Sequence, residues 1–310
     1  MIRIYETDCK DPYRNLAAEE LFMESDPADI VLFLWQNENT IVIGRNQDAW
    51  AECRVQEFLA DGGRIARRKS GGGAVYHDTG NLNFSFVAAD ENYNVRRQLG
   101  VIAEAVSAFG IPAEISGRND LTVSGRKFSG NAFYDNKRMK LHHGTILIDT
   151  DPGKIAAYLT PNERKLAKRG VKSVGARVVC LKELCPEVTV DDMKTAVKEA
   201  FLSEYSPEGS MQTICLSAER SFFSETGIIE RKAEEYADPA LIFGTGRGFD
   251  SRMEFGTGDS TFTVHYKEED GIITDAVVYT DSMDWNAAAK LRRQLIGSPA
   301  GKENQWIKGS

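Results

Sequence analysis

The sequence feature that most constrains the structure and function of this chain is a run of three glycines. It lies between basic residues and a strand-like stretch. Residues 67–78 read Arg-Arg-Lys-Ser-Gly-Gly-Gly-Ala-Val-Tyr-His-Asp, and the pattern continues to Asn83. Glycine allows positive φ and lets the backbone approach a ligand closely. Successive amides in such a turn form an anion-binding concavity, to which neighbouring cations add formal charge. The run therefore predicts a phosphate or adenylate cradle; the alternative is a glycine-rich hairpin whose basic residues face water.

Composition narrows the choice of partners and compartment. The chain has 310 residues and a formal net charge of −8, whereas binding to nucleic acid usually requires a basic excess. Its five cysteines are scattered without disulfide or zinc spacing, no leader is recognisable, and no apolar run approaches the roughly 18 residues that span a bilayer. We therefore expect a cytoplasmic protein with neither a nucleic acid nor a membrane as partner.

Hydrophobic periodicity predicts an α+β protein on mixed or antiparallel sheets, because strands cluster in the first half and helices are spaced irregularly. Around residues 243–248 the composition becomes loop-like, so we expect a domain over residues 1–245 and a small α+β accessory domain over 246–310. The expected helices cover 15–22, 48–59, 95–109, 190–201 and 285–295. The expected strands cover 30–35, 40–44, 82–86, 141–148, 262–266 and 272–279, with a hairpin over 121–134 that turns at Ser124-Gly125.

Two further segments could carry chemistry. Lys127 lies between glycine-rich turns, where it can reach a ligand as a point charge, and Asp120 offers a carboxylate to Mg²⁺. A hairpin tip without function is the alternative. His142 and His143 are adjacent on a strand and point to opposite faces, so they do not share a metal, and we expect at least one to be structural. The two standard nucleotide-binding glycine motifs are absent.

Several motifs, in order along the chain, resemble the signature of lipoate–protein ligases. They are the glycine run over 67–81, Leu32–Trp35, Thr40–Gln47, Gly117–Leu121, Gly125–Lys127 and His142–Thr145. The resemblance extends from near the N-terminus to about residue 205, and more loosely to about 285. It implies the α+β catalytic fold that this family shares with biotin protein ligases.

The resemblance also implies a reaction. Members activate lipoate with Mg²⁺-ATP to lipoyl-AMP and transfer the lipoyl group to a lysine ε-amine. The acceptors are lipoyl domains of 2-oxoacid dehydrogenase E2 subunits or the glycine-cleavage H protein. ATP and Mg²⁺ are thus the expected cofactors and lipoate the expected substrate.

By the same resemblance, Lys127 is the expected catalytic residue, against the carboxylate and α-phosphate. Asn119 and Asp120 are expected near the phosphate, with Asp120 on the metal, and a basic segment over 160–173 is a candidate mobile cover. The expected walls of the lipoate tunnel are Trp35, Gly72, Gly73 and Val75. The other expected substrate contacts are Arg68, Ser70, Gly71, His77, Asn83, His143, Gly144 and Thr145.

Three alternatives remain open. An octanoyl or lipoyl transferase of the same fold would use a cysteine thioester, for which Cys180 is the candidate nucleophile. The chain after Asp284 is brief for the family's accessory domain, so transfer from preformed lipoyl-AMP is a second alternative. The third is a non-catalytic module that binds lipoyl domains.

Overall fold

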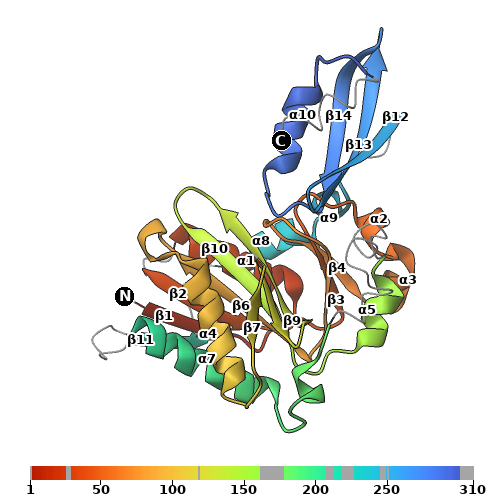
Figure 1. Cartoon of the computed structure of the whole chain (residues 1–310). Helices are drawn as coiled ribbons and strands as arrows, with labels where there is room; N and C mark the ends of the chain where they lie inside the picture. The colour runs from red at the N-terminus through yellow and green to blue at the C-terminus, as the bar shows by residue number, and fades with distance from the viewer. Residues whose placement is uncertain are drawn as a thin grey trace.

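An eight-stranded mixed sheet forms the centre of the main body (Figure 1). The computed structural model describes residues 2–25, 29–117, 119–160, 178–206, 213–217, 227–244, 249 and 251–300. The sheet order is β11-β1-β2-β6-β10-β9-β8-β7, with the first three strands parallel and the remaining neighbours antiparallel. In chain order the strands are β1 (Ile2–Glu6), β2 (Ile30–Trp35), β6 (Asn81–Ala88), β7 (Glu114–Ser116), β8 (Asp120–Val123), β9 (Arg126–Asp135), β10 (Lys140–Leu147) and β11 (Thr213–Ser217).

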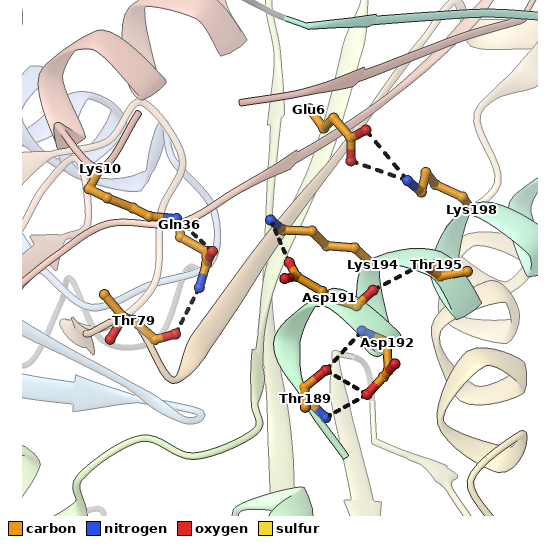
Figure 2. A network of polar contacts seen from close by, with 10 residues as sticks. All are labelled: Glu6, Lys10, Gln36, Thr79, Thr189, Asp191, Asp192, Lys194, Thr195 and Lys198. Carbon is orange, nitrogen blue, oxygen red and sulfur yellow. Dashed lines mark hydrogen bonds and ion pairs between the residues drawn. The ribbon is translucent and has the colours of Figure 1, made fainter. Parts of the chain in front are cut away.

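Helices cover both faces of this sheet, which confirms the predicted α+β class (Figure 1). On one face lie α4 (Val95–Ser107) and α7 (Val190–Tyr205), whose apolar residues recur at the helical period that the sequence shows. A capping box starts α7: the Thr189 hydroxyl accepts from the Asp192 amide at 3.1 Å (Figure 2). The other face carries α1 (Pro12–Ser25) and α8 (Ile228–Ala237).

A second sheet of three short strands, in the order β4-β3-β5, lies beside the large one. Its strands are β3 (Thr40–Ile43), β4 (Arg64–Arg67) and β5 (Val75–His77). Its outer side packs on the short helices α2 (Ala49–Glu52), α3 (Val55–Ala60), α5 (Pro152–Tyr158) and α9 (Pro239–Phe243). The described part of the main body also contains the 3₁₀ turns η1 (Asp90–Asn92) and η3 (Leu181–Glu183).

The prediction of one helix over 48–59 is wrong, because the chain breaks between α2 and α3. Cys53 forms an isolated antiparallel bridge with Leu159, and the Arg54 amide donates to Tyr158 O at 2.9 Å. These contacts with the end of α5 take backbone groups that a continuous helix would use internally. The break is therefore a tertiary effect that helical periodicity does not report.

The C-terminal strands form a meander of their own, drawn in blue in Figure 1. It comprises β12 (Ser251–Thr257), β13 (Ser260–Glu269) and β14 (Ile272–Thr280), and α10 (Ala287–Leu295) packs on it. The predicted boundary at residues 245–246 lies outside the described residues, so the two-domain division stays a prediction. Among the described helices, none combines the length and apolarity needed to cross a bilayer.

Arg67 ties the second sheet to α9 through backbone carbonyls. Its guanidinium is buried and donates to Gly44 O, Arg45 O and Gln47 O, at 3.0, 3.0 and 2.7 Å. It also donates to Leu241 O in α9, at 2.8 Å. Burial lowers the pKa of Arg67 to about 10, which still leaves it a cation at neutral pH. The sequence predicts that this residue supplies charge for an anion, whereas in the structure it joins three chain segments.

Replacing Arg67 with Met is expected to lower the free energy of unfolding by about 3 kcal/mol or more, because several buried carbonyls lose their donor. Urea titration of the two proteins measures the difference. Arg14→Met is the control: Arg14 lies 3.0 Å from Glu230 with both side chains about half exposed, so the loss should stay below roughly 1 kcal/mol. Equal losses in the two variants would contradict this role of Arg67.

Candidate active site

Polar residues form two adjacent rows across the large sheet, on the face toward β4-β3-β5. Trp35 is paired with Asn83, and Asn83 with Thr145, while Ser85 lies opposite His143 in the next row. The alternation of residues 82–86 predicts a half-buried strand, but β6 is buried on both faces. The second sheet covers its polar side, so these residues are enclosed inside the protein. Four predicted site residues thus converge between the two sheets.

The glycine loop after β4 is braced by Arg68, which is 6% exposed. Its guanidinium donates to Gly71 O at 2.7 Å, to Gly73 O at 2.8 Å and to Val42 O at 3.0 Å. Burial lowers the pKa of Arg68 to about 10, so the group remains a buried cation. These bonds hold the loop carbonyls; direct contact of Arg68 with substrate stays a prediction.

A chain of buried hydrogen bonds joins this loop to the large sheet and to α1. Arg68 Nε donates to Ser70 Oγ at 3.0 Å, and Ser70 Oγ lies 2.6 Å from His143 Nε2. His143 Nδ1 lies 2.8 Å from Glu19 Oε1, the acceptor that fixes the proton on Nδ1.

The chain of hydrogen bonds continues from Glu19 through Ser85 to Trp35. Glu19 Oε1 also accepts from Ser85 Oγ at 2.5 Å, and Ser85 Oγ accepts from Trp35 Nε1 at 3.0 Å. The sequence motifs predict Ser70, His143 and Trp35 as site residues, but they do not predict Glu19 and Ser85. A carboxylate among the apolar residues of α1 was the available signal for Glu19.

Lys127 reaches the same layer from β9, over a glycine. Its Nζ lies 2.7 Å from Asp120 Oδ1, and a Cβ at Gly130 would come within 2.7 Å of that nitrogen. The strand pairing shifts between Leu121 and Thr122, a bulge of the kind that redirects a side chain. With Lys127 30% and Asp120 21% exposed, a ligand can reach the pair.

Asn119 is held beside this pair by a reciprocal contact. Its Nδ2 donates to Asn131 O at 2.9 Å, and Asn131 Nδ2 donates back to Asn119 O at 2.8 Å. His142 Nε2 lies 2.9 Å from Asn131 Oδ1, on the opposite face of β10 from His143, so His142 is the structural histidine. A Cβ at Gly144 would lie 2.4 Å from Asn131 Oδ1, so Gly144 makes room for that amide on the face away from Lys127.

The segment after β14 contacts the glycine loop. Gly72, at φ +91°, donates its amide to Ser282 O at 2.9 Å. Met283 Sδ lies 3.8 Å from Asn119 Nδ2. An anion at the Gly72 amide must therefore replace the Ser282 carbonyl. Gly73 is exposed and Val75 half-buried beyond this contact.

Two sequence predictions remain to be placed in the structure, those for His77 and for the cover segment over residues 160–173. His77 lies edge-on to the Trp35 ring, with centroids 6.3 Å apart, and so belongs to the layer between the sheets. The predicted cover over residues 160–173 falls almost entirely outside the described residues, which end at Thr160 and resume at Val178. The Val179 amide, which follows that gap, donates to Lys127 O at 2.9 Å.

Comparison with known proteins identifies the class that this fold and site define. The model of the lipoyl protein ligase A/B catalytic domain matches residues 11–202, and the chain belongs to this family. Lipoate-protein ligase A of Bdellovibrio bacteriovorus is 36% identical over 301 residues, which cover 96% of this chain and 88% of the relative. The family resemblance seen in the sequence is thereby confirmed.

Solved structures agree on the fold. LipL1 of P. falciparum, in complex with lipoate, superposes with a TM-score of 0.83 at 26% identity, covering 96% of this chain and 90% of that one. A bipartite lipoate protein ligase of Thermoplasma acidophilum gives a TM-score of 0.64 at 24% identity, covering 81% and 98%. At 24% identity, the match to the Thermoplasma acidophilum ligase shows a shared fold and nothing more.

Gly71→Ala is expected to displace the segment after β14, because its Cβ would lie 2.4 Å from Ser282 O and 2.9 Å from Met283 O. Hydrogen–deuterium exchange measures this displacement as faster exchange of the Gly72 amide and of residues 280–286. Gly73→Ala is the matched control, since its Cβ would meet no atom within 4 Å. Indistinguishable exchange in both variants would show that Gly71 is not in tight contact with this segment.

Proposed function

We propose that this protein activates lipoate with Mg²⁺-ATP and transfers the lipoyl group to a lysine of an acceptor protein. The observation that carries the proposal is the Lys127–Asp120 pair over Gly130, at the open end of a layer lined by Trp35 and His143. A carboxylate that attacks a polyanion needs a fixed cation to offset repulsion and hold the reacting atoms in line. Lys127 is suited to that task.

The layer between the two sheets is suited to bind lipoate. Trp35 offers an indole ring, and Gly72, Gly73 and Val75 form the proposed opposite wall. Burial of the alkyl chain is worth roughly 0.8 kcal/mol per methylene. The complex of LipL1 with lipoate supports lipoate as the ligand of this layer. In this proposed binding mode, lipoate lies along Ser70, His143 and Thr145.

ATP and Mg²⁺ are proposed to bind beside Lys127. A lipoate-protein ligase A bound with ATP shares the fold at 23% identity and a TM-score of 0.63, which supports nucleotide binding. Asp120 fits a magnesium ion held mostly by phosphates, because Mg²⁺ commonly takes only one or two carboxylates beside substrate oxygens. Among the described residues no group of three or more acidic, cysteine or histidine side chains forms a protein-only metal site. Bound there, the ion would neutralise phosphate charge.

Two displacements make up the proposed reaction. In the first, a carboxylate oxygen of lipoate attacks the α-phosphorus of ATP, and pyrophosphate leaves with the electrons of the broken P–O bond. In the second, a neutral lysine amine attacks the acyl carbon, AMP leaves, and the nitrogen loses a proton. Lys127 would hold the carboxylate and the α-phosphate in the first step and the acyl-adenylate formed from them in the second. The enclosed layer limits the access of water to this intermediate.

Lipoyl domains of 2-oxoacid dehydrogenase E2 subunits and the H protein are the proposed acceptors. The Thermoplasma acidophilum ligase was solved together with its E2 lipoyl domain, which supports lipoyl domains as a class of partner. The H protein rests on the family resemblance alone.

The cysteine-thioester alternative is disfavoured by the surroundings of Cys180. Its thiol is buried and donates to Thr150 O at 3.2 Å. Burial raises the pKa of Cys180 to about 11, so almost none of it is thiolate at neutral pH. A nucleophile for acyl transfer needs the opposite shift.

Lys127→Ala should lower lipoylation of a lipoyl domain about 10²- to 10³-fold, the usual loss when one preorganised charge-stabilising donor is removed. Intact mass spectrometry of the acceptor, with lipoate and Mg²⁺-ATP supplied, measures the rate. Lys182→Ala, which removes an exposed lysine paired with Asp149, is the matched control and should keep wild-type activity.

Each alternative predicts a different outcome of the same assay. Modification only from preformed lipoyl-AMP would identify a transferase that does not adenylate. Modification only from octanoyl-acyl carrier protein, lost in Cys180→Ser, would establish the thioester route. Binding of the lipoyl domain without any modification would indicate a non-catalytic module.

Iodoacetamide at pH 8 is expected to leave Cys180 and Cys53 unmodified in the native protein, because burial raises the pKa of Cys53 as well, to about 12. Cys9 and Cys185 are only partly buried and should react first. Peptide mass mapping after a timed quench distinguishes these four of the five thiols. Rapid alkylation of Cys180 would return it to consideration as a nucleophile.

A further inference from the structure

The neighbour of Glu19 on α1, Glu20, is a buried carboxylate with its own set of partners. Its side chain is 10% exposed. Glu20 Oε1 accepts from Lys69 Nζ and, at 2.8 Å, from Lys232 Nζ. Glu20 Oε2 accepts from Tyr236 Oη at 2.8 Å. A buried carboxylate is destabilising unless it is paired and hydrogen-bonded, and two ammonium groups and a phenol meet that need here.

The partners of Glu20 belong to two different parts of the chain. Lys232 and Tyr236 are at helical i, i+4 spacing, so they project from the same face of α8, which packs against α1 (Figure 1). Lys69 belongs to the glycine loop and directly precedes Ser70. Glu20 therefore connects the glycine loop to the pair of helices α1 and α8.

Glu20 is ionised at neutral pH. Burial by itself would raise the pKa of Glu20, but the hydrogen bonds from its three donors outweigh burial and lower this pKa to about 2. Burial, with a further contribution from Glu20, raises the pKa of Tyr236 well above its ordinary value, so the phenol remains a donor. The three contacts are therefore charge-assisted hydrogen bonds at neutral pH.

The charge of Glu20 does not depend on Lys69 for a partner. Lys232 Nζ donates to the same carboxylate oxygen, and Tyr236 donates to the other. Lys232 has a second carboxylate partner, Glu24, at 3.1 Å, but the Glu24 side chain is 43% exposed and is accessible to water. Without Lys69, Glu20 would keep one cation and one hydroxyl donor. The consequence of the Lys69 contact is therefore sought in the loop.

The three glycines after Ser70 give the loop a large conformational entropy to lose. Glycine loses more backbone freedom on ordering than any other residue, and Gly72 lies at φ +91°. A loop that is ordered only when the ligand binds weakens affinity, whereas a loop that is already held does not. The ion pair of Lys69 fixes the chain at the entry to these glycines.

Two adjacent carboxylates of α1 thus hold two adjacent residues of the loop. Glu19 is linked to Ser70 through His143. Glu20 is linked to Lys69 directly. The first link is buried between the sheets, whereas the Lys69 side chain is 38% exposed. Lys69 can therefore be replaced without opening the buried layer.

We propose that Lys69 is a positioning residue, whose ion pair with Glu20 holds the glycine loop in the conformation that binds the acyl-adenylate. The inference rests on the proposed function, which supplies the ligand of the loop. Lys69 acts through Glu20 and through the loop backbone, without touching the reacting atoms.

Hydrogen–deuterium exchange of the ligand-free protein tests whether Lys69 holds the loop. Lys69→Met removes the ion pair but keeps an apolar stem, so residues 70–73 should exchange faster than in the wild type. Lys69→Arg keeps the cation and should restore slow exchange. Lys198→Met is the matched control: it breaks the partly exposed pair of Lys198 with Glu6, at 3.2 Å, and should leave exchange of the loop unchanged. Wild-type exchange in Lys69→Met would overturn the proposal.

Octanoyl-sulfamoyl-adenosine, a stable analogue of an acyl-adenylate, tests the effect on binding by isothermal titration calorimetry. Lys69→Met should weaken its binding about tenfold, the cost of ordering roughly one further residue on binding. Lys69→Arg should bind it as the wild type does. Glu20→Gln should weaken binding to a similar extent, and Lys69→Met added to Glu20→Gln should cause no further loss, because both changes remove one contact.

Two results of the titration would contradict the proposal. One is undiminished binding by Lys69→Met. The other is a further loss of about tenfold when Lys69→Met is added to Glu20→Gln, because Lys69 would then contact the ligand itself. If Glu20→Gln does not fold, Lys69→Met and Lys69→Arg decide. A wild-type protein that does not bind the analogue would contradict the proposed function, whereas exchange in the ligand-free loop would still decide whether Lys69 holds it.

Discussion

The buried hydrogen-bond chain that runs from Arg68 through Ser70, His143 and Glu19 to Ser85 is the interaction on which the site depends. It joins the glycine loop, the large sheet and α1. Because the chain buries the Arg68 guanidinium and the Glu19 carboxylate, it is favourable only when each of its polar groups has a hydrogen-bond partner. The geometry of the layer between the sheets is therefore set as one unit rather than residue by residue.

The sequence predicts well what depends on neighbours along the chain. The helix over 95–109 follows from apolar residues at helical spacing, and the hairpin turns at Ser124-Gly125, where both residues adopt positive φ. That hairpin brings Lys127 back against Asp120, so this part of the candidate site is local as well. The family resemblance supplied the residues of the layer, which periodicity alone does not assign.

What the sequence does not reveal depends on distant contacts. The break between α2 and α3 comes from Leu159, and the contact that engages the Gly72 amide comes from Ser282, some 210 residues away. Glu19 becomes a site residue only because α1 packs on the face of the sheet that carries His143. Such pairings are fixed by the assembled fold, and no local pattern encodes them.

The order of strands has a consequence for synthesis of the chain. β1, at the N-terminus, lies between β2 and β11, so one edge of Ile2–Glu6 has no partner until Thr213–Ser217 has been made. The Arg67 side chain likewise cannot donate to Leu241 O until residue 241 has been made. Because the ribosome delivers about 5 to 20 residues per second, the nascent chain spends many seconds with an open parallel edge. The N-terminal strand is thus the segment with the longest exposure to misassembly before the ligase is complete.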